Sequence, residues 1–122
     1  MVTAREILDR ETTEAAWARI VERAMDLGAW HYYHPYDPRH SQTILDYIAW
    51  RERVIWVELK TERGRLTRDR WVMDKRGRSY HVRGQLETIG DLRQAGQEVH
   101  IWRPHDFEEM CTVLGVDAHA LR

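Results

Sequence analysis

Two apolar segments that follow each other closely constrain the fold most. Residues 43–50 read TILDYIAW and residues 53–60 read RVIWVELK, and each has the length and the β-branched and aromatic content of a strand. Because side chains alternate between the two faces of a strand, apolar residues here fall on both faces. Strands of this kind are usually covered on both sides, which predicts a central sheet packed between helices.

The loop between the two strands decides whether their charged residues meet. With a two-residue turn at 51–52, Asp46 and Glu58 point to opposite faces of the sheet. With a three-residue loop at 51–53, Asp46 lies directly opposite Glu58. We favour the three-residue loop or an equivalent bulge, which places both carboxylates and Lys60 on one face at the edge of the sheet.

Two carboxylates in this arrangement suit a divalent metal ion. Their Cβ atoms would lie about 5 Å apart, and the two charges would repel unless a cation lay between them. Mg²⁺ usually takes one or two carboxylates from a protein and fills its other positions with waters and phosphate oxygens. The ion can activate a water for attack on phosphorus, and Lys60 can orient that water or stabilise developing charge. The alternative is that Glu58 and Lys60 form the solvated end of an ordinary strand.

The charge of the chain is distributed unevenly. Its net charge is −1, but residues 60–83 hold nine Lys or Arg against three acids, and 17 of the 19 basic residues of the chain are Arg. The planar guanidinium group suits phosphate oxygens better than the Lys ammonium group does. A localised basic segment on an otherwise acidic chain predicts nucleic-acid binding, although a solvated charged loop has the same composition.

Helices and short strands alternate along the rest of the chain, which predicts an α/β fold around one sheet. Apolar residues at helical spacing indicate a helix at 14–27, with Thr13 as its N-cap and Gly28 as its stop. The other expected elements are a helix at 4–10, a strand at 29–36, a polar hairpin formed by 70–74 and 78–82, a helix at 84–96 with Leu86, Ile89 and Leu92 inward, a strand at 97–103 and a helix at 105–115.

The order of these motifs resembles the virus-type replication-repair nuclease (VRR-NUC) domains of phages, which belong to the PD-(D/E)xK nuclease superfamily. Asp46, the Glu58-Leu-Lys60 triplet and the Gly64-Arg-Leu-Thr67 stretch are similar to the central motifs of that family. The resemblance covers roughly residues 13–106. The further matching positions are Glu14, Tyr33-His34, Asp37-Pro-Arg39-His-Ser41, Gln85, Ala95-Gly96 and Val99-His-Ile-Trp-Arg-Pro104.

Three positions depart from the family pattern. Thr43-Ile44-Leu45 stands where the family has Gly-x-Pro before its aspartate, which puts the approach to Asp46 in question. Ala18 stands where a helix glutamine often occurs. The chain between Thr67 and Gln85 is longer than the family pattern, which indicates an inserted β-hairpin near 68–83.

The resemblance implies a single nuclease domain over residues 1–122 with a restriction-endonuclease-like α/β core, a central mixed sheet flanked by helices. It also implies the catalytic set. Asp46 and Glu58 would bind Mg²⁺ or Mn²⁺, and Lys60 would assist the attacking water.

Two helix residues complete the catalytic set that the resemblance implies. Gln85 would support the site from the helix that follows the inserted hairpin, and Glu14 would face the site from the first helix. Each has a simpler interpretation: Glu14 as a first-turn carboxylate favoured by the helix dipole, and Gln85 as an ordinary residue at a helix N-terminus.

The activity implied is that of a divalent-metal-dependent DNA endonuclease similar to Holliday-junction resolvases, acting on branched DNA as a homodimer. Two other interpretations stay open: a nucleic-acid-binding module that does not cut, and a phage interaction protein whose charges only solvate its surface. The residues expected to contact the nucleic acid are His34, Arg39, Ser41, Arg63, Arg65, Thr67, Arg68, Arg70, Arg76 and Arg78.

Aromatic residues divide into two groups. Trp50, Trp56 and Trp102 lie in expected strands and are predicted to be core residues. Trp71 and the Tyr80-His81 pair lie in the polar hairpin between arginines, where an aromatic ring either stacks on an unpaired base or forms a cross-strand pair that stabilises the hairpin.

Composition also bears on the location of the protein. No apolar run approaches the roughly 18–20 residues that span a bilayer, and residues 1–10 lack the apolar region of a signal peptide. The single cysteine, Cys111, excludes an intrachain disulfide, and the seven histidines show no recognised zinc-ligand spacing. We therefore expect a cytoplasmic protein without membrane partners, located in the host cytoplasm if a phage encodes it.

Overall fold

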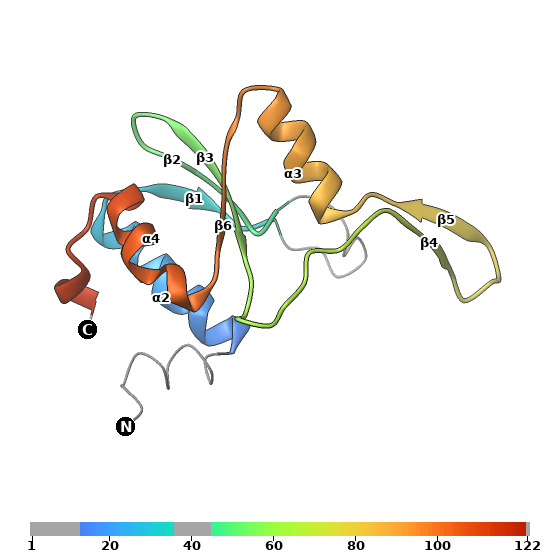
Figure 1. Cartoon of the computed structure of the whole chain (residues 1–122), viewed down its shortest axis with the longest axis horizontal. Helices are drawn as coiled ribbons and strands as arrows, with labels where there is room; N and C mark the ends of the chain where they lie inside the picture. Colours follow the sequence, from blue (N-terminus) through green and yellow to red (C-terminus); the bar gives the residue numbers. More distant parts are fainter. Residues whose placement is uncertain (1–12, 36–44, 122) are drawn as a thin grey trace.

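The computed structural model describes residues 13–35 and 45–121 of the 122-residue chain. A four-stranded mixed sheet carries helices on both faces, and a two-stranded hairpin projects from one side (Figure 1). The expected α/β class is thus confirmed. The elements in chain order are α2 (Glu14–Leu27), β1 (His31–Tyr33), β2 (Tyr47–Trp50), β3 (Val54–Leu59), β4 (Arg70–Met73), β5 (Ser79–Val82), α3 (Gln85–Gln94), β6 (Glu98–Trp102), η1 (Pro104–Asp106), α4 (Phe107–Leu114) and η2 (Ala118–Leu121).

The main sheet has the strand order β1-β2-β3-β6. The pairs β1–β2 and β2–β3 are antiparallel, whereas β3 and β6 are parallel. A parallel pair needs a long crossover connection, and here that connection contains both the β4–β5 hairpin and helix α3. The hairpin is therefore an addition to the crossover rather than a part of the main sheet.

Both faces of β3 are covered, as its two apolar faces predict. Ile55, Val57 and Leu59 pack against α2 and α4 in the larger core. Trp56 points to the opposite face and packs with Ile89 of α3 in a smaller core. The sheet consequently separates two hydrophobic cores. The carboxyl end of β3 lies between α2 and α4 on one face of the sheet and α3 on the other.

The loop between β2 and β3 has the expected three residues. Trp50 pairs with Val54, and Tyr47 pairs with Val57. β2 begins only at Tyr47, so Asp46 lies in a bend just before the strand rather than inside it. The register nevertheless continues through this bend and places Asp46 opposite Glu58.

Helix α2 has the predicted bounds and the predicted N-cap. The Thr13 side chain accepts a hydrogen bond of 3.1 Å from the Ala16 N–H. Gly28 ends the helix but has φ of −83°, and the left-handed residue is Ala29 with φ of 60°. Glycine is needed at 28 for another reason, because a Cβ there would lie 2.9 Å from the Leu114 carbonyl oxygen.

Two predictions about inward-facing residues are wrong. Leu86 lies in the first turn of α3 and is exposed, whereas Ile89 is buried and Leu92 packs beside it against the smaller core, as expected. Trp50 is exposed as well. It lies on the sheet face that α3 covers only near β6, and its ring stacks on His31 with 5.9 Å between centroids.

Some element boundaries also differ from the expectation. Within residues 29–35, the expected strand is limited to β1. The helix expected at 105–115 starts as a short 3₁₀ turn before α4. The helix expected at 4–10 lies outside the described residues. None of the helices within 13–35 and 45–121 has the length and apolar character needed to cross a bilayer.

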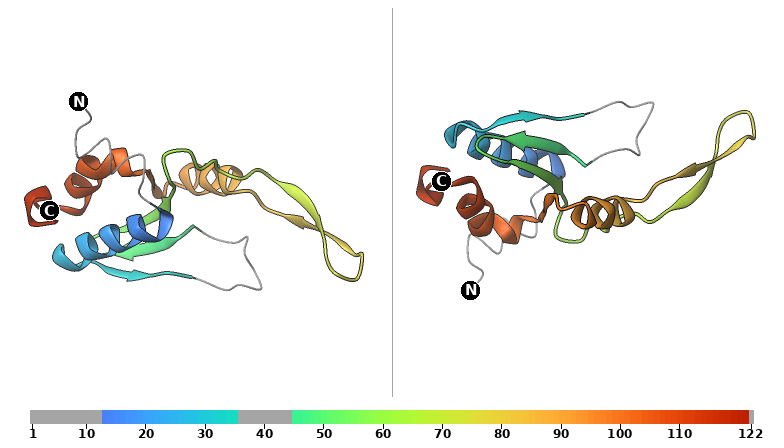
Figure 2. Two further views of the ribbon diagram at one scale, coloured as in Figure 1. Left: turned by 90° about the horizontal axis from the view of Figure 1, so that it is seen from below. Right: turned by 90° about the horizontal axis from the view of Figure 1, so that it is seen from above.

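Residues 68–83, which we call the arm, consist of the β4–β5 hairpin and its two connections to the body. The hairpin is antiparallel, with Trp71 opposite His81, as the sequence predicted. Figure 2 shows the arm extending away from the sheet and from α3 in two views. At its base the two chain segments approach closely, since a Cβ on Gly84 would overlap the backbone of Arg68.

We predict that Gly84→Ala destabilises the protein by about 1–3 kcal/mol, because the added methyl group collides with backbone that cannot move independently. Gly90→Ala is the matched control within the same helix, where an added Cβ meets nothing within 4 Å. That change should stabilise the protein by about 0.5–1 kcal/mol through helix propensity. Urea unfolding of both variants checks the prediction, and equal effects of the two changes would contradict it.

Candidate active site

Asp46 and Glu58 lie side by side where β2 begins and β3 ends. The Asp46 carboxylate accepts a hydrogen bond of 2.7 Å from the N–H of Leu59, and the Glu58 carboxylate accepts one of 3.2 Å from the N–H of Asp46. Each side chain thus bonds to the backbone of the opposite strand. These two bonds continue the hairpin beyond its last paired residues and fix both carboxylates.

Glu58 is deeply buried, and two further side chains meet its carboxylate. Its side chain is 2% exposed, and Lys60 Nζ lies 3.7 Å from its Oε1 atom. The same oxygen accepts a hydrogen bond of 2.7 Å from the Gln85 side-chain amide. Lys60 is itself held in place, because its backbone N–H donates to the Trp102 carbonyl at 3.1 Å.

Gln85 is positioned in turn by Thr67, which lies on the segment leading into the arm. The Thr67 N–H donates to the Gln85 side-chain oxygen, and the Thr67 hydroxyl accepts from the Gln85 N–H, both at 3.1 Å. The Thr67 carbonyl accepts a third bond, of 3.0 Å, from the N–H of Leu86. Thr67 therefore caps α3 from a distant segment, while the adjacent N-cap residue Gly84 has no side chain to do so.

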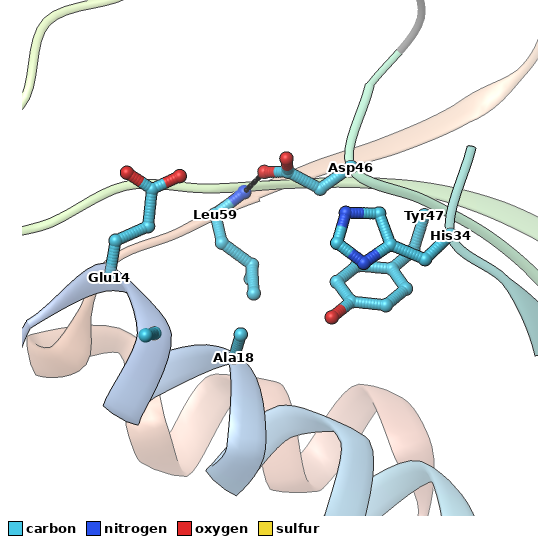
Figure 3. A pocket seen from close by; sticks show the side chains of 7 residues that line it. Glu14, Ala18, His34, Asp46, Tyr47 and Leu59 are labelled. Atoms are coloured by element: carbon cyan, nitrogen blue, oxygen red, sulfur yellow. Dashed lines mark hydrogen bonds between the residues drawn. The ribbon is translucent and has the colours of Figure 1, made fainter. Parts of the chain in front are cut away.

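Glu14 approaches the same region from the first turn of α2. It lines a pocket of about 380 Å³ together with Asp46 and His34. Figure 3 shows the Glu14 and Asp46 carboxylates on the same side of this pocket, to either side of Leu59. His34 lies across the pocket against the Tyr47 ring, with 4.5 Å between the ring centroids.

The electrostatics of the cluster favour a cation. Burial raises the pKa of Glu58 to about 8, and the nearby Asp46 carboxylate and, more weakly, Glu14 act in the same direction. The Lys60 ammonium opposes this shift without cancelling it. Glu14 and Asp46 line the pocket, whereas Glu58 lies buried beside Asp46 and outside the lining. A cation bound beside Asp46 and Glu58 would favour the charged form of Glu58 and so lower its pKa.

The donor set fits Mg²⁺ or Mn²⁺. Within residues 13–35 and 45–121, no group of three or more His, Cys, Asp or Glu side chains is placed to hold a metal by itself. Mg²⁺ does not need one, because it commonly binds one or two carboxylates and keeps waters and phosphate oxygens as its other ligands. Asp46 and Glu58 offer two such carboxylates, and each oxygen has lone pairs beyond those its hydrogen bond uses.

The residues expected at the nucleic acid fall in three places. His34 lines the pocket, and Arg39 and Ser41 lie outside the described residues. The remaining residues lie on the arm or on the segment that joins β3 to the arm; they are Arg63, Arg65, Thr67, Arg68, Arg70, Arg76 and Arg78. All of these arginines are exposed, whereas the Thr67 hydroxyl accepts a hydrogen bond from α3.

Sequence reasoning missed the residue that holds the segment after Lys60. The Arg103 guanidinium donates to the carbonyl oxygens of Thr61 and Gly64, both at 2.6 Å. In the same place the Glu62 carboxylate accepts a hydrogen bond of 2.7 Å from the His105 N–H. The Arg-Pro pair after the last strand was part of the resemblance, but nothing local in the sequence indicates which carbonyls the guanidinium binds.

Comparisons of this chain with protein-family models, with curated proteins and with solved structures found no match. The candidate site therefore depends on its own residues and their geometry. The resemblance to VRR-NUC domains stays a prediction from the sequence.

The raised pKa of Glu58 predicts a pH-dependent stability in the absence of metal. Between its ordinary value of 4.5 and about 8, the folded protein holds a proton on Glu58 that the unfolded chain releases. The free energy of unfolding therefore falls as the pH rises through this range. Urea unfolding at several pH values in EDTA checks this, and Glu58→Gln should remove this part of the slope.

The matched control is Glu109→Gln, on the exposed surface of α4, which should keep the slope. Mg²⁺ should raise the melting temperature more at pH 8 than at pH 6, because it binds the deprotonated carboxylate. A slope that is the same in Glu58→Gln and in the unsubstituted protein would contradict the assignment.

Proposed function

We propose that this protein is a divalent-metal-dependent endonuclease that hydrolyses phosphodiester bonds in DNA. The observation that carries the proposal is the pairing of Asp46 with Glu58 at the sheet edge, with the Lys60 ammonium 3.7 Å from the Glu58 carboxylate. These three residues are also the centre of the resemblance to VRR-NUC domains of the PD-(D/E)xK superfamily, so geometry and sequence point to the same chemistry.

Asp46 and Glu58 would hold Mg²⁺ or Mn²⁺ through their carboxylate oxygens. When bound, such an ion polarises a phosphoryl oxygen and lowers the pKa of a coordinated water. The Leu59 N–H fixes the direction of the Asp46 carboxylate, and the Gln85 amide fixes that of Glu58. Ligands held in this way lose little further conformational freedom on binding, which is the advantage of a preorganised site.

Lys60 acts on the reacting water and on the phosphate. Hydrolysis joins the water oxygen to phosphorus and breaks one bond from phosphorus to a deoxyribose oxygen, which then takes up a proton. An ammonium group beside the attack position orients the water and stabilises the negative charge that develops on the phosphate oxygens. The Lys60 side chain is 14% exposed, so its charge is only partly screened by solvent.

Branched DNA and a homodimer are part of the proposal. They are supported by the resemblance to Holliday-junction resolvases and by the arginines between the site and the arm. Phosphate contacts from Arg63 and Arg65 would hold the strand beside Lys60, since both side chains are exposed on the segment that follows it. Such contacts would make the affinity for DNA fall steeply with salt concentration.

The test is cleavage of a synthetic four-way junction, a linear duplex and a single strand, each with Mg²⁺, with Mn²⁺ and with EDTA. We expect metal-dependent cutting of the junction. Lys60→Ala should lower the cleavage rate constant by about 10²–10³-fold, and Asp46→Asn should remove metal-dependent cutting. Glu109→Gln, a carboxylate change on exposed α4, is the control and should keep full activity.

The outcomes of this assay separate the three interpretations of the sequence. Binding of DNA without cutting in either metal would leave a nucleic-acid-binding module and contradict the nuclease. Neither binding nor cutting would leave the interaction protein. Cutting that persists in Lys60→Ala would place the chemistry elsewhere in the chain.

A further inference from the structure

We infer that the arm, residues 68–83, is a second nucleic-acid contact that recognises an unstacked base through Trp71 and so selects the DNA that the carboxylate site cuts. The inference rests on the proposed function for its ligand, a nucleic acid, and for the cutting that the arm would direct, whereas recognition of the base by Trp71 can be tested without cutting. It adds a recognition element that is separate from Asp46, Glu58 and Lys60.

The arm exposes large apolar side chains to an unusual degree. Trp71 is 71% exposed and Met73 is 69% exposed, the two highest values among the large hydrophobic residues of the described chain. Directly paired residues of a hairpin share a face, so Trp71 and Met73 lie on one face with His81 and Ser79. An isolated two-stranded ribbon is only marginally stable, and exposed aromatic area on it favours a binding role over a packing role.

The Trp71 ring contacts the His81 ring on one side and is exposed to solvent on its other sides. Its centroid lies 5.5 Å from that of the His81 ring, at an interplanar angle of 58°. The His81 Nε2 atom lies 3.7 Å from the Asp69 carboxylate, beyond hydrogen-bond distance. The cross-strand pair accounts for the position of the indole ring but leaves most of its surface uncovered. A ring that is fixed and open is suited to stack on a base.

The charge of the arm indicates what covers the ring. Both acids of the arm accept hydrogen bonds from backbone N–H groups. Asp69 accepts from the N–H of Gly84, at the base of the arm, at 2.7 Å, and Asp74 accepts from the N–H groups of Arg76 and Arg78 at 2.9 Å. Asp69 also pairs with Arg83, and Asp74 with the Arg78 side chain.

Four further basic residues of the arm show no ion pair within the described residues; they are Arg68, Arg70, Lys75 and Arg76. An exposed aromatic ring between basic side chains is the pattern of proteins that stack bases and hold the backbone phosphates of a single strand. This complementarity favours a nucleic acid over a second protein surface as the occupant.

The base of the arm ties this contact to the site. Thr67, which precedes the arm, bonds to Gln85 at 3.1 Å, and Gln85 bonds to Glu58 at 2.7 Å. Two hydrogen bonds thus connect the base of the arm to the Glu58 carboxylate. Trp71 lies four positions after Thr67. Four steps of extended chain span at most about 13 Å, which is the rise of about four nucleotides. A base stacked on Trp71 would therefore place the cut a few nucleotides away.

The test compares a duplex carrying one unpaired 2-aminopurine with the same duplex fully paired. Binding is measured in EDTA, so that no cutting occurs. We expect the unpaired base to strengthen binding about tenfold and its fluorescence to be quenched by stacking. Trp71→Ala should remove both effects and change the affinity for the paired duplex less than twofold. Trp71→Phe should restore most of the preference, because it keeps a ring.

Trp50→Ala is the matched control, since Trp50 is the exposed tryptophan of the main sheet and lies outside the arm. It should keep the preference for the unpaired base. Melting temperatures of the Trp71 variants should stay close to that of the unsubstituted protein because the side chain is mostly exposed. A preference for the unpaired base that survives Trp71→Ala overturns the inference. The inference is also overturned if Trp71→Ala changes only the oligomeric state, measured by sedimentation.

The failure of this inference and the failure of the proposed function give different results. Cutting that requires Lys60 but ignores Trp71 would keep the nuclease and overturn the role of the arm. Selective binding that requires Trp71, without cutting in Mg²⁺ or Mn²⁺, would keep the role of the arm and overturn the nuclease. If both hold, cuts should cluster within about five nucleotides of the unpaired base and scatter in Trp71→Ala.

Discussion

The register between β2 and β3 is the constraint on which the rest of the structure depends. A loop of three residues places Asp46 opposite Glu58 and lets each carboxylate bond to the backbone of the other strand. A shift of one residue would turn every side chain of β2 to the other face. The larger core would then lose Tyr47 and Ala49, and the two carboxylates would separate. Packing and the candidate site thus require the same register.

Glu58 is the one buried charged side chain within the described residues, and it lies at the junction of the two cores. Burying a carboxylate costs stability unless its charge is compensated. Gln85 and Lys60 compensate in part, but the pKa of the group is still raised to about 8. An apolar residue at this position would make a more stable sheet edge. Retention of a buried ionisable group beside Asp46 and Lys60 is the pattern expected of a working site.

Local patterns predicted much of this architecture, because they depend on neighbours in the sequence. Helix α2 and its Thr13 cap follow from periodicity and capping chemistry alone. For the β2–β3 loop the sequence left two lengths open, and the one that brings Asp46 opposite Glu58 is the one observed. The exposure of Trp50 does not follow from local patterns, because it depends on how far α3 extends across the sheet. The contact from Thr67 to Gln85 was equally hidden, since it joins residues 18 positions apart that no periodicity relates. The sequence predicted Asp46, Glu58, Lys60 and the supporting Gln85, whereas the contacts of Thr67 with Gln85 and of Arg103 with the segment after Lys60 were revealed only by the fold.

The bond between Thr67 and Gln85 also closes the body of the protein beneath the arm. The two ends of the inserted segment are already joined, so the loop-closure entropy of whatever lies between them has little effect on the fold. Val82 and Gly84 are the buried residues at this junction, and the rest of the hairpin is largely solvent-exposed. We therefore expect the sheet and its paired carboxylates to tolerate hairpins of other lengths or sequences at this position, provided that the contacts at the base of the arm are kept.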